Sequence, residues 1–100
     1  MDKVNELYKK IVKNNDKVVV FGLSTCGYCK STIKYLKEKN IPYKFYNINK
    51  IYNIFFKLLL KVKELHPELS FEPNHKTVPV IFYNEFFIGG YSDLIKNVHI

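Results

Sequence analysis

Two cysteines, Cys26 and Cys29, are the residues of this sequence whose type and spacing most directly suggest chemistry. Two residues separate them, and such a pair can form a disulfide, supply half of a metal site or consist of two ordinary buried thiols. A zinc site needs about four ligands. The histidines that could complete one, His66 and His75, lie in a distant segment without ligand-like spacing. The pair therefore favours thiol–disulfide exchange over metal binding.

The residues around the pair predict how it is positioned. Residues 17–21 form a β-branched run typical of a buried strand, residues 22–25 form a loop, and a helical pattern begins at Cys26. A helix N-terminus stabilises a thiolate through its unpaired N–H groups and its positive partial charge. We therefore expect Cys26 to be the nucleophile, with Lys30 adding positive charge nearby. Cys29 follows one helical turn later, where its sulfur can attack a mixed disulfide on Cys26.

The rest of the chain supplies the elements that must hold the pair in place. Hydrophobic periodicity and turn signals predict a helix over 2–12, the strand over 17–21, a helix from Cys26 to about Asn40, a strand over Pro42–Ile48, a helix over Ile51–Leu65, strands over Val78–Tyr83 and Phe86–Ile88, and a last helix capped by Ser92 that ends near Val98. The order αβαβαββα predicts an α/β fold, in which helices flank both faces of a four-stranded mixed sheet.

The predicted helix over Ile51–Leu65 is unusually apolar. Phe55, Phe56 and the three leucines at positions 58–60 cannot all lie on one face of a helix. Two interpretations remain open. The helix is buried over a wide face, or part of it forms a surface for a partner or a second copy of the chain.

Length and charge limit the classes of function. One hundred residues fit a single domain, and the net charge of +7 comes from 16 lysines with no arginine. Nucleic-acid sites commonly use arginine forks, so we expect no nucleic-acid partner; a preference for acidic partners is an alternative. No apolar run approaches the roughly 18 residues of a membrane span. We expect a cytoplasmic protein without a membrane partner, where thiols stay reduced and a cysteine pair is catalytic or metal-binding.

A second stretch, KTVPVIFYNEFFIGGYSD from Lys76 to Asp93, adds to the motif STCGYC. Together these motifs resemble the glutaredoxin family of the thioredoxin-fold superfamily, over about residues 17–94. The resemblance implies a thioredoxin fold, a single glutaredoxin-like domain over residues 1–100, and a dithiol enzyme with Cys26 and Cys29 as catalytic residues. It also implies glutathione as co-substrate.

The resemblance further implies a glutathione site. Pro79 should be cis and face the cysteines, so that the backbone of Val78 pairs with the peptide of glutathione. Ser92 and Asp93 should hold its γ-glutamyl end at the start of the last helix. The expected glutathione-binding residues are Tyr28, Lys76, Thr77, Val78, Pro79, Gly90, Ser92 and Asp93.

Three features depart from the family pattern. Family members commonly carry Lys or Arg where this chain has Leu23, and there it contacts the glycine carboxylate of glutathione; Lys76, or else His75, can substitute. Gly27 stands where the commonest dithiol motif has proline. Motifs with a small residue there are associated with a [2Fe–2S] cluster that Cys26 and glutathione hold between two protomers. The segment 49–76 is longer than in many relatives.

These features predict a glutathione-dependent thiol–disulfide oxidoreductase that reduces protein disulfides and glutathionylated proteins. The protein is expected to be a monomer with no bound metal, or a dimer if a cluster is bound. Two alternatives stay open: a module that binds or carries a [2Fe–2S] cluster, and a thioredoxin-like protein that a thioredoxin reductase reduces.

Overall fold

The computed structural model describes residues 2–13, 16–72 and 74–97. Its elements follow the predicted order, with a short 3-10 helix added before the third α-helix. They are α1 (Asp2–Val12), β1 (Val18–Gly22), α2 (Gly27–Glu38), β2 (Tyr43–Asn47), η1 (Asn49–Ile51), α3 (Tyr52–Leu65), β3 (Val80–Tyr83), β4 (Phe86–Gly89) and α4 (Tyr91–Asn97). The predicted end of the last helix at Val98 lies outside the described residues.

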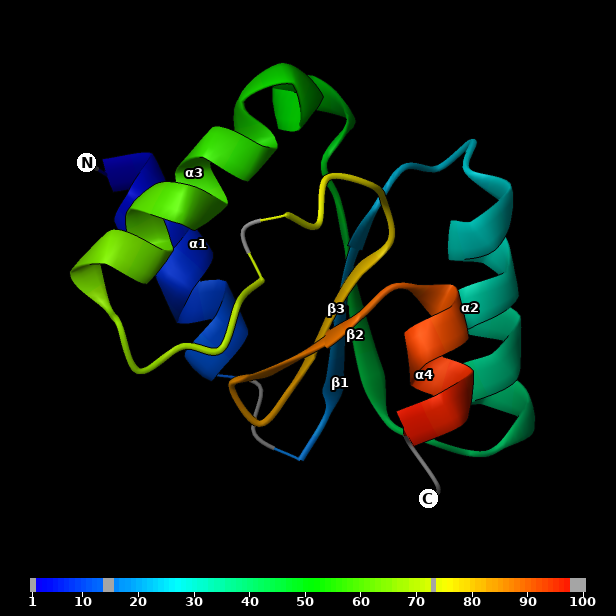
Figure 1. The fold of residues 1–100 in the computed structure, drawn as a ribbon. Helices are drawn as coiled ribbons and strands as arrows, with labels where there is room; N and C mark the ends of the chain where they lie inside the picture. The colour runs from blue at the N-terminus through cyan, green and yellow to red at the C-terminus, as the bar shows by residue number, and fades with distance from the viewer. Residues whose placement is uncertain (1, 14–15, 73, 98–100) are drawn as a thin grey trace.

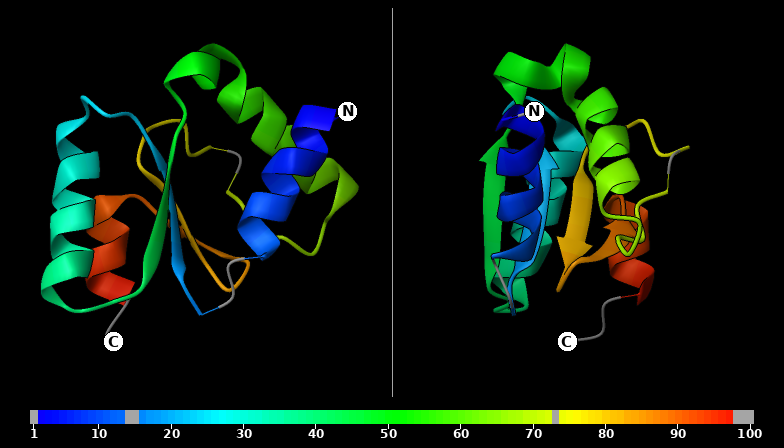
Figure 2. Two further views of the ribbon diagram at one scale, coloured as in Figure 1. Left: turned by 180° about the vertical axis from the view of Figure 1, so that it is seen from behind. Right: turned by 90° about the vertical axis from the view of Figure 1, so that its left-hand side faces the viewer.

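The four strands form one mixed sheet in the order β2-β1-β3-β4. β1 runs parallel to β2, with α2 as the crossover between them, and antiparallel to β3, which forms a hairpin with β4. Helices α1 and α3 cover one face of the sheet and α2 and α4 cover the other (Figure 1, Figure 2). The predicted α/β fold with a four-stranded mixed sheet is therefore confirmed.

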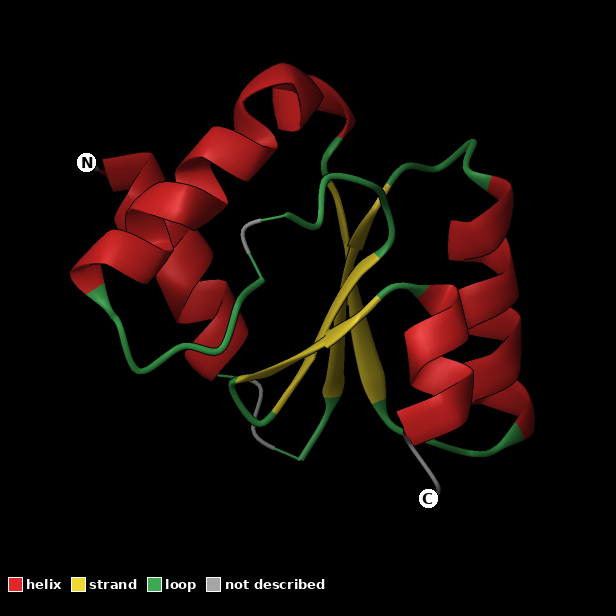
Figure 3. Cartoon of the chain, in the orientation of Figure 1, coloured by secondary structure: helices red, strands yellow, loops and turns green. Residues whose placement is uncertain are grey.

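The core has two halves because the side chains of β1 alternate between the two faces. Val19 and Phe21 pack into the larger half with α1 and α3, whereas Val18 and Val20 pack into the smaller half with α2 and α4. All four side chains are buried. β1 thus fixes the sheet between its helix layers, and its C-terminal end leads directly into the cysteine loop (Figure 3).

Helix α3 is buried over a broad face. Phe55, Leu59 and Val62 are fully buried against α1 and the sheet, and Phe56 and Leu58 are half-buried at the edge of the same cluster. Several apolar side chains lie outside this face and are exposed; they are Tyr52, Ile54, Leu60 and Leu65. The first interpretation therefore accounts for most of the helix. No helix among the described residues is long and apolar enough to span a bilayer.

Candidate active site

Cys26 and Cys29 lie at the junction between β1 and α2. Cys26 is the N-cap residue of α2, and its Sγ accepts a hydrogen bond from the backbone N–H of Cys29 at 3.3 Å. This is the position at which an orphan N–H of the first helical turn can stabilise a thiolate. Cys26 is partly exposed, whereas Cys29 is only 2% exposed. The two thiols therefore have different environments.

Burial sets the chemistry of Cys29. Together with the hydrogen bond to the Cys26 side chain, burial raises the pKa of Cys29 from an ordinary 9.0 to about 12. Cys29 therefore stays a protonated thiol at neutral pH and is not a free nucleophile. The Cys29 thiol can attack a disulfide sulfur only after a base has removed its proton. The nearest sulfur to it is that of Cys26.

The raised pKa of Cys29 predicts how stability depends on pH. The unfolded thiol ionises near pH 9 while the folded thiol holds its proton to about pH 12, so this contribution is complete below pH 9 and is lost as the pH rises toward 12. A tenfold difference between the two acid dissociation constants is worth on the order of 1.4 kcal/mol. Lysines and tyrosines titrate in the same range, so the comparison is with Cys29→Ala. Denaturant unfolding under a non-thiol reductant measures the unfolding free energy at each pH. Between about pH 9 and pH 12 this free energy should fall by a few kcal/mol more in the wild type than in Cys29→Ala. An equal fall in both proteins would contradict the raised pKa of Cys29.

The loop before Cys26 is tied to the segment that follows β2. The side-chain amide of Asn49 donates to Ser24 Oγ at 3.2 Å, and its Oδ1 accepts the Ser24 N–H at 3.4 Å. The Ile48 N–H donates to the Gly22 carbonyl at 2.9 Å. These contacts hold the cysteine loop at the end of the sheet.

A groove lies next to Cys26. The Val78–Pro79 peptide bond is cis, as predicted, and the Val78 carbonyl lies 4.0 Å from Cys26 Sγ. The groove encloses about 230 Å³. It is lined by Tyr28, His75, Thr77, Val78, Pro79, Gly90, Tyr91, Ser92 and Asp93. Seven of the eight predicted glutathione-binding residues therefore surround one cavity, and Lys76 does not line it.

The turn from β4 into α4 forms the far wall of the groove. Gly89 has φ +121°, a conformation that L side chains rarely adopt, and the Asp93 carboxylate fills the space beside it. Asp93 Oδ2 accepts the Gly90 N–H at 3.0 Å. Asp93 thus reaches back to the residue before the helix, as in a capping box.

The predicted cap of this helix is corrected by the same contacts. The sequence predicts that Ser92 caps the helix, but α4 begins at Tyr91, so Ser92 lies inside the first turn. The physical reason is the side chain of Asp93, which satisfies the N–H of Gly90 and lets the helix start earlier. Ser92 still faces the groove.

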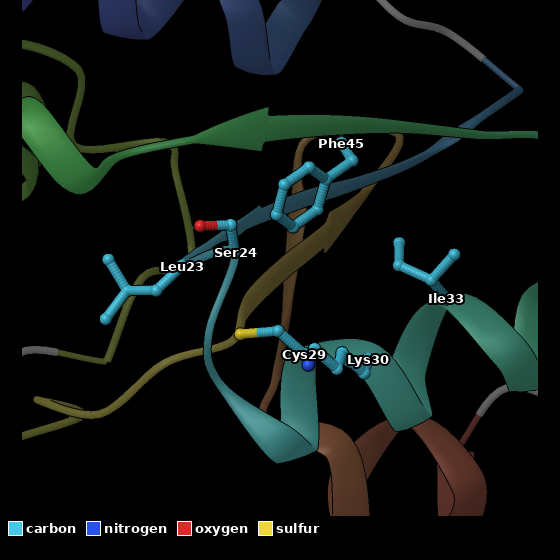
Figure 4. Close-up of a pocket in the computed structure, with 6 residues that line it drawn as sticks. All are labelled: Leu23, Ser24, Cys29, Lys30, Ile33 and Phe45. Atoms are coloured by element: carbon cyan, nitrogen blue, oxygen red, sulfur yellow. The ribbon is translucent and has the colours of Figure 1, made fainter.

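Leu23 lies away from this groove. Its side chain lines a second cavity of about 260 Å³, with Ser24, Phe45 and the α2 residues Cys29, Lys30 and Ile33 (Figure 4). Leu23 therefore adds no charge to the groove beside Cys26. Lys30 lines this second cavity and not the groove next to Cys26.

His75 and Tyr91 are the groove residues that the sequence did not single out first. The His75 ring packs edge-on against Phe87, and its Nε2 is buried without a hydrogen-bond partner among the described residues. Tyr91 lies 6.1 Å from Tyr28 between ring centroids, so two phenols border the groove. Tyr91 follows Gly89-Gly90 directly, and this placement at a helix start is the signal that could have identified it.

Comparison with known proteins identifies the family. The family model described as Glutaredoxin matches residues 18–88. The chain belongs to the glutaredoxin family. It is 41% identical over 78 residues to a probable glutaredoxin of Acanthamoeba polyphaga mimivirus, covering 78% of this chain and 74% of that protein. It is 36% identical over 88 residues to glutaredoxin-2 of Schizosaccharomyces pombe, covering 88% and 72%.

Solved glutaredoxins share the fold. The dithiolic glutaredoxin 2-C-Grx1 of Trypanosoma brucei brucei is 33% identical with a TM-score of 0.58, covering 81% of this chain and 75% of that one. A buckwheat glutaredoxin–glutathione complex is 20% identical with a TM-score of 0.68, covering 95% and 78%. The glutaredoxin family and the Cys26–Cys29 pair are consistent with a thiol–disulfide oxidoreductase.

No group of three or more His, Cys, Asp or Glu side chains within residues 2–13, 16–72 and 74–97 could hold a metal ion. Thiol–disulfide exchange begins with the attack of a thiolate on a disulfide sulfur, and the partly exposed Cys26, the buried Cys29 and the adjoining groove are compatible with that chemistry.

Proposed function

We propose that this glutaredoxin is a glutathione-dependent oxidoreductase that reduces protein disulfides and glutathionylated proteins. One observation carries the proposal: Cys26 is partly exposed within 4.0 Å of the Val78 carbonyl in the groove wall, while Cys29 is buried behind it. A substrate sulfur can therefore reach Cys26 and not Cys29. The domain over residues 1–100 acts as a monomer in a reducing compartment such as the cytoplasm.

The chemistry is thiol–disulfide exchange in two stages. The Cys26 thiolate attacks one sulfur of the target disulfide, and the other sulfur leaves and takes up a proton. With a protein target, Cys29 then attacks the Cys26 sulfur; the bond from Cys26 to the target breaks, the target sulfur leaves with the proton that Cys29 gives up, and the Cys26–Cys29 disulfide remains. Two glutathione molecules reduce that bond and become glutathione disulfide. With a glutathionylated target, Cys26 takes the glutathionyl group and a second glutathione removes it.

The groove is proposed to hold glutathione in one orientation. The Val78 backbone pairs with the cysteinyl residue as a strand edge would, and Tyr28 and Thr77 border that segment. By family resemblance the γ-glutamyl end lies at Ser92 and Asp93, where Asp93 supplies the negative charge for its ammonium. Gly90 and Pro79 complete the wall.

The glycine carboxylate of glutathione needs a cation or a hydrogen-bond donor. His75 lines the groove, whereas Lys76 is exposed outside the groove. His75 is therefore the better-placed residue, and the contact with Lys76 stays a prediction. The adjacent variants His75→Ala and Lys76→Ala form a matched pair for comparing glutathione affinity.

The source of electrons tests the proposal. Turnover of a glutathionylated peptide should proceed with glutathione, glutathione reductase and NADPH, and should be close to background with thioredoxin reductase and NADPH. The rate of NADPH consumption is the measurement. Equal or faster turnover with thioredoxin reductase would favour the thioredoxin-like alternative instead.

The cluster-binding alternative rests on Gly27, where an added Cβ would meet no atom within 4 Å. Gly27 is exposed next to Cys26, so a small residue leaves the surface there uncovered. Anaerobic reconstitution with iron, sulfide and glutathione, followed by a visible absorption spectrum, separates the alternatives. A coloured dimer with little reductase activity would contradict the proposed function and support cluster binding.

A further inference from the structure

Gly22, the last residue of β1, touches the buried thiol of the pair. It belongs to the face of β1 that carries Val18 and Val20, so a side chain at this position would point toward α2. A Cβ built there would lie 2.6 Å from Cys29 Sγ and 3.3 Å from Cys29 Cβ. Real Cβ atoms essentially never approach another heavy atom as closely as the first of these distances. The sulfur of Cys29 therefore occupies space that only a glycine leaves free.

The surroundings allow the sulfur few other positions. The same Cβ would lie 3.1 Å from Phe45 Cε1, so β2 closes one side. The Cys29 backbone is fixed in the first turn of α2, where its N–H is bonded to Cys26 Sγ. A displaced sulfur can turn toward Cys26 or into the cavity that Cys29 shares with Leu23 and Phe45 (Figure 4). Either movement removes Cys29 from its buried position against β1.

We propose that Gly22 is a positioning residue for the dithiol state. Because Gly22 has no side chain, the Cys29 thiol can occupy the space next to its Cα. The inference rests on the proposed redox function of the pair. In the disulfide state the two sulfurs are bonded about 2.05 Å apart, and the Cys29 sulfur moves from Gly22 toward Cys26. Gly22 therefore stabilises the reduced pair relative to the oxidised pair.

Oxidation of the pair by a small disulfide measures this preference. The Cys26 and Cys29 thiols give two electrons to oxidised dithiothreitol; one S–S bond forms in the protein, the cyclic S–S bond of the reagent breaks, and two protons pass to the reagent's thiols. Gly22→Ala should favour the protein disulfide about tenfold, since overpacking a core costs the reduced state. Tenfold corresponds to a potential lower by about 30 mV.

The experiment uses the full chain with Gly22→Ala, equilibrated in dithiothreitol buffers, quenched with acid, alkylated and weighed by mass spectrometry. The expected result is a shift toward the disulfide, with a larger loss of stability in the reduced protein than in the oxidised protein. Equal losses in both states and an unchanged equilibrium would overturn the proposal. Dithiothreitol does not depend on the glutathione groove, so failure of the protein to use glutathione would leave this result standing.

A second variant separates a steric effect on the thiol from a general effect on folding. In a Cys29→Ala background the Sγ is absent, and Gly22→Ala should destabilise the chain much less than it destabilises the reduced wild type. If Gly22→Ala alone does not fold and the double variant does, the conflict lies with the sulfur and the proposal is supported. If the double variant loses as much stability as the single one, the conflict lies with Phe45 or the backbone, and the proposal is wrong.

Discussion

Cys26→Ser is expected to lower turnover of both protein disulfides and glutathionylated peptides by at least about a thousandfold, because Cys29, the other cysteine of the sequence, is buried and cannot replace it. Cys29→Ser should divide the two activities. Reduction of a glutathionylated peptide should persist, since glutathione itself can release the adduct on Cys26. Reduction of a protein disulfide should fall strongly, since Cys29 is the thiol that resolves that adduct.

Each of the two variants, Cys26→Ser and Cys29→Ser, serves as the control for loss of folding in the other. Cys26 is the N-cap of α2 and Cys29 lies in its first turn, so a loss of folding caused by removing a sulfur there would lower both activities of both variants. Circular dichroism of each variant checks that the fold is kept. Near-normal turnover by Cys26→Ser would show that the nucleophile has been misassigned.

Gly89→Ala should be the most damaging single change at the groove wall. The substituted residue would be strained at φ +121°, and its Cβ would lie 2.4 Å from Asp93 Oδ2, displacing the carboxylate that caps α4. A strained residue and a lost cap together cost about 2–4 kcal/mol of unfolding free energy. Denaturant unfolding measures this loss, and calorimetric titration with glutathione should show weaker binding.

Asp93→Asn separates the two effects of that change. The amide oxygen of asparagine can still accept the Gly90 N–H, so stability should change little. The negative charge proposed to meet the ammonium of glutathione is lost, so affinity should fall. Unchanged affinity in Asp93→Asn would remove Asp93 from the proposed site while leaving its capping role intact.

Much of this fold is predictable because local patterns and tertiary structure agree. The β-branched run at Val18–Val20 packs into both halves of the core, as a buried strand must. The residues TVP predict the cis bond at Pro79 through the family resemblance, and the strand-loop-helix pattern predicts Cys26 at the start of a helix with Cys29 one turn later.

The remaining details depend on three-dimensional contacts that one-dimensional patterns do not contain. Serine is a residue type favoured at helix N-caps, yet the capping hydrogen bond of α4 is made by Asp93, whose side chain reaches back to the N–H of Gly90. Lys76 has the positive charge expected of a residue that contacts the glycine carboxylate of glutathione, whereas His75 is the one of the two that lines the groove. A glycine at the end of a strand can mark a close approach of another chain segment, but only the structure shows that Gly22 meets the sulfur of Cys29.

The most direct test of the central claim is the mass of the trapped intermediate. Cys29→Ser is mixed with a glutathionylated peptide, quenched with acid and analysed by intact-protein and peptide mass spectrometry. One glutathionyl group bound to Cys26, and removed by added glutathione, is the predicted result. A variant that reduces the peptide without ever carrying the group on Cys26 would contradict the account.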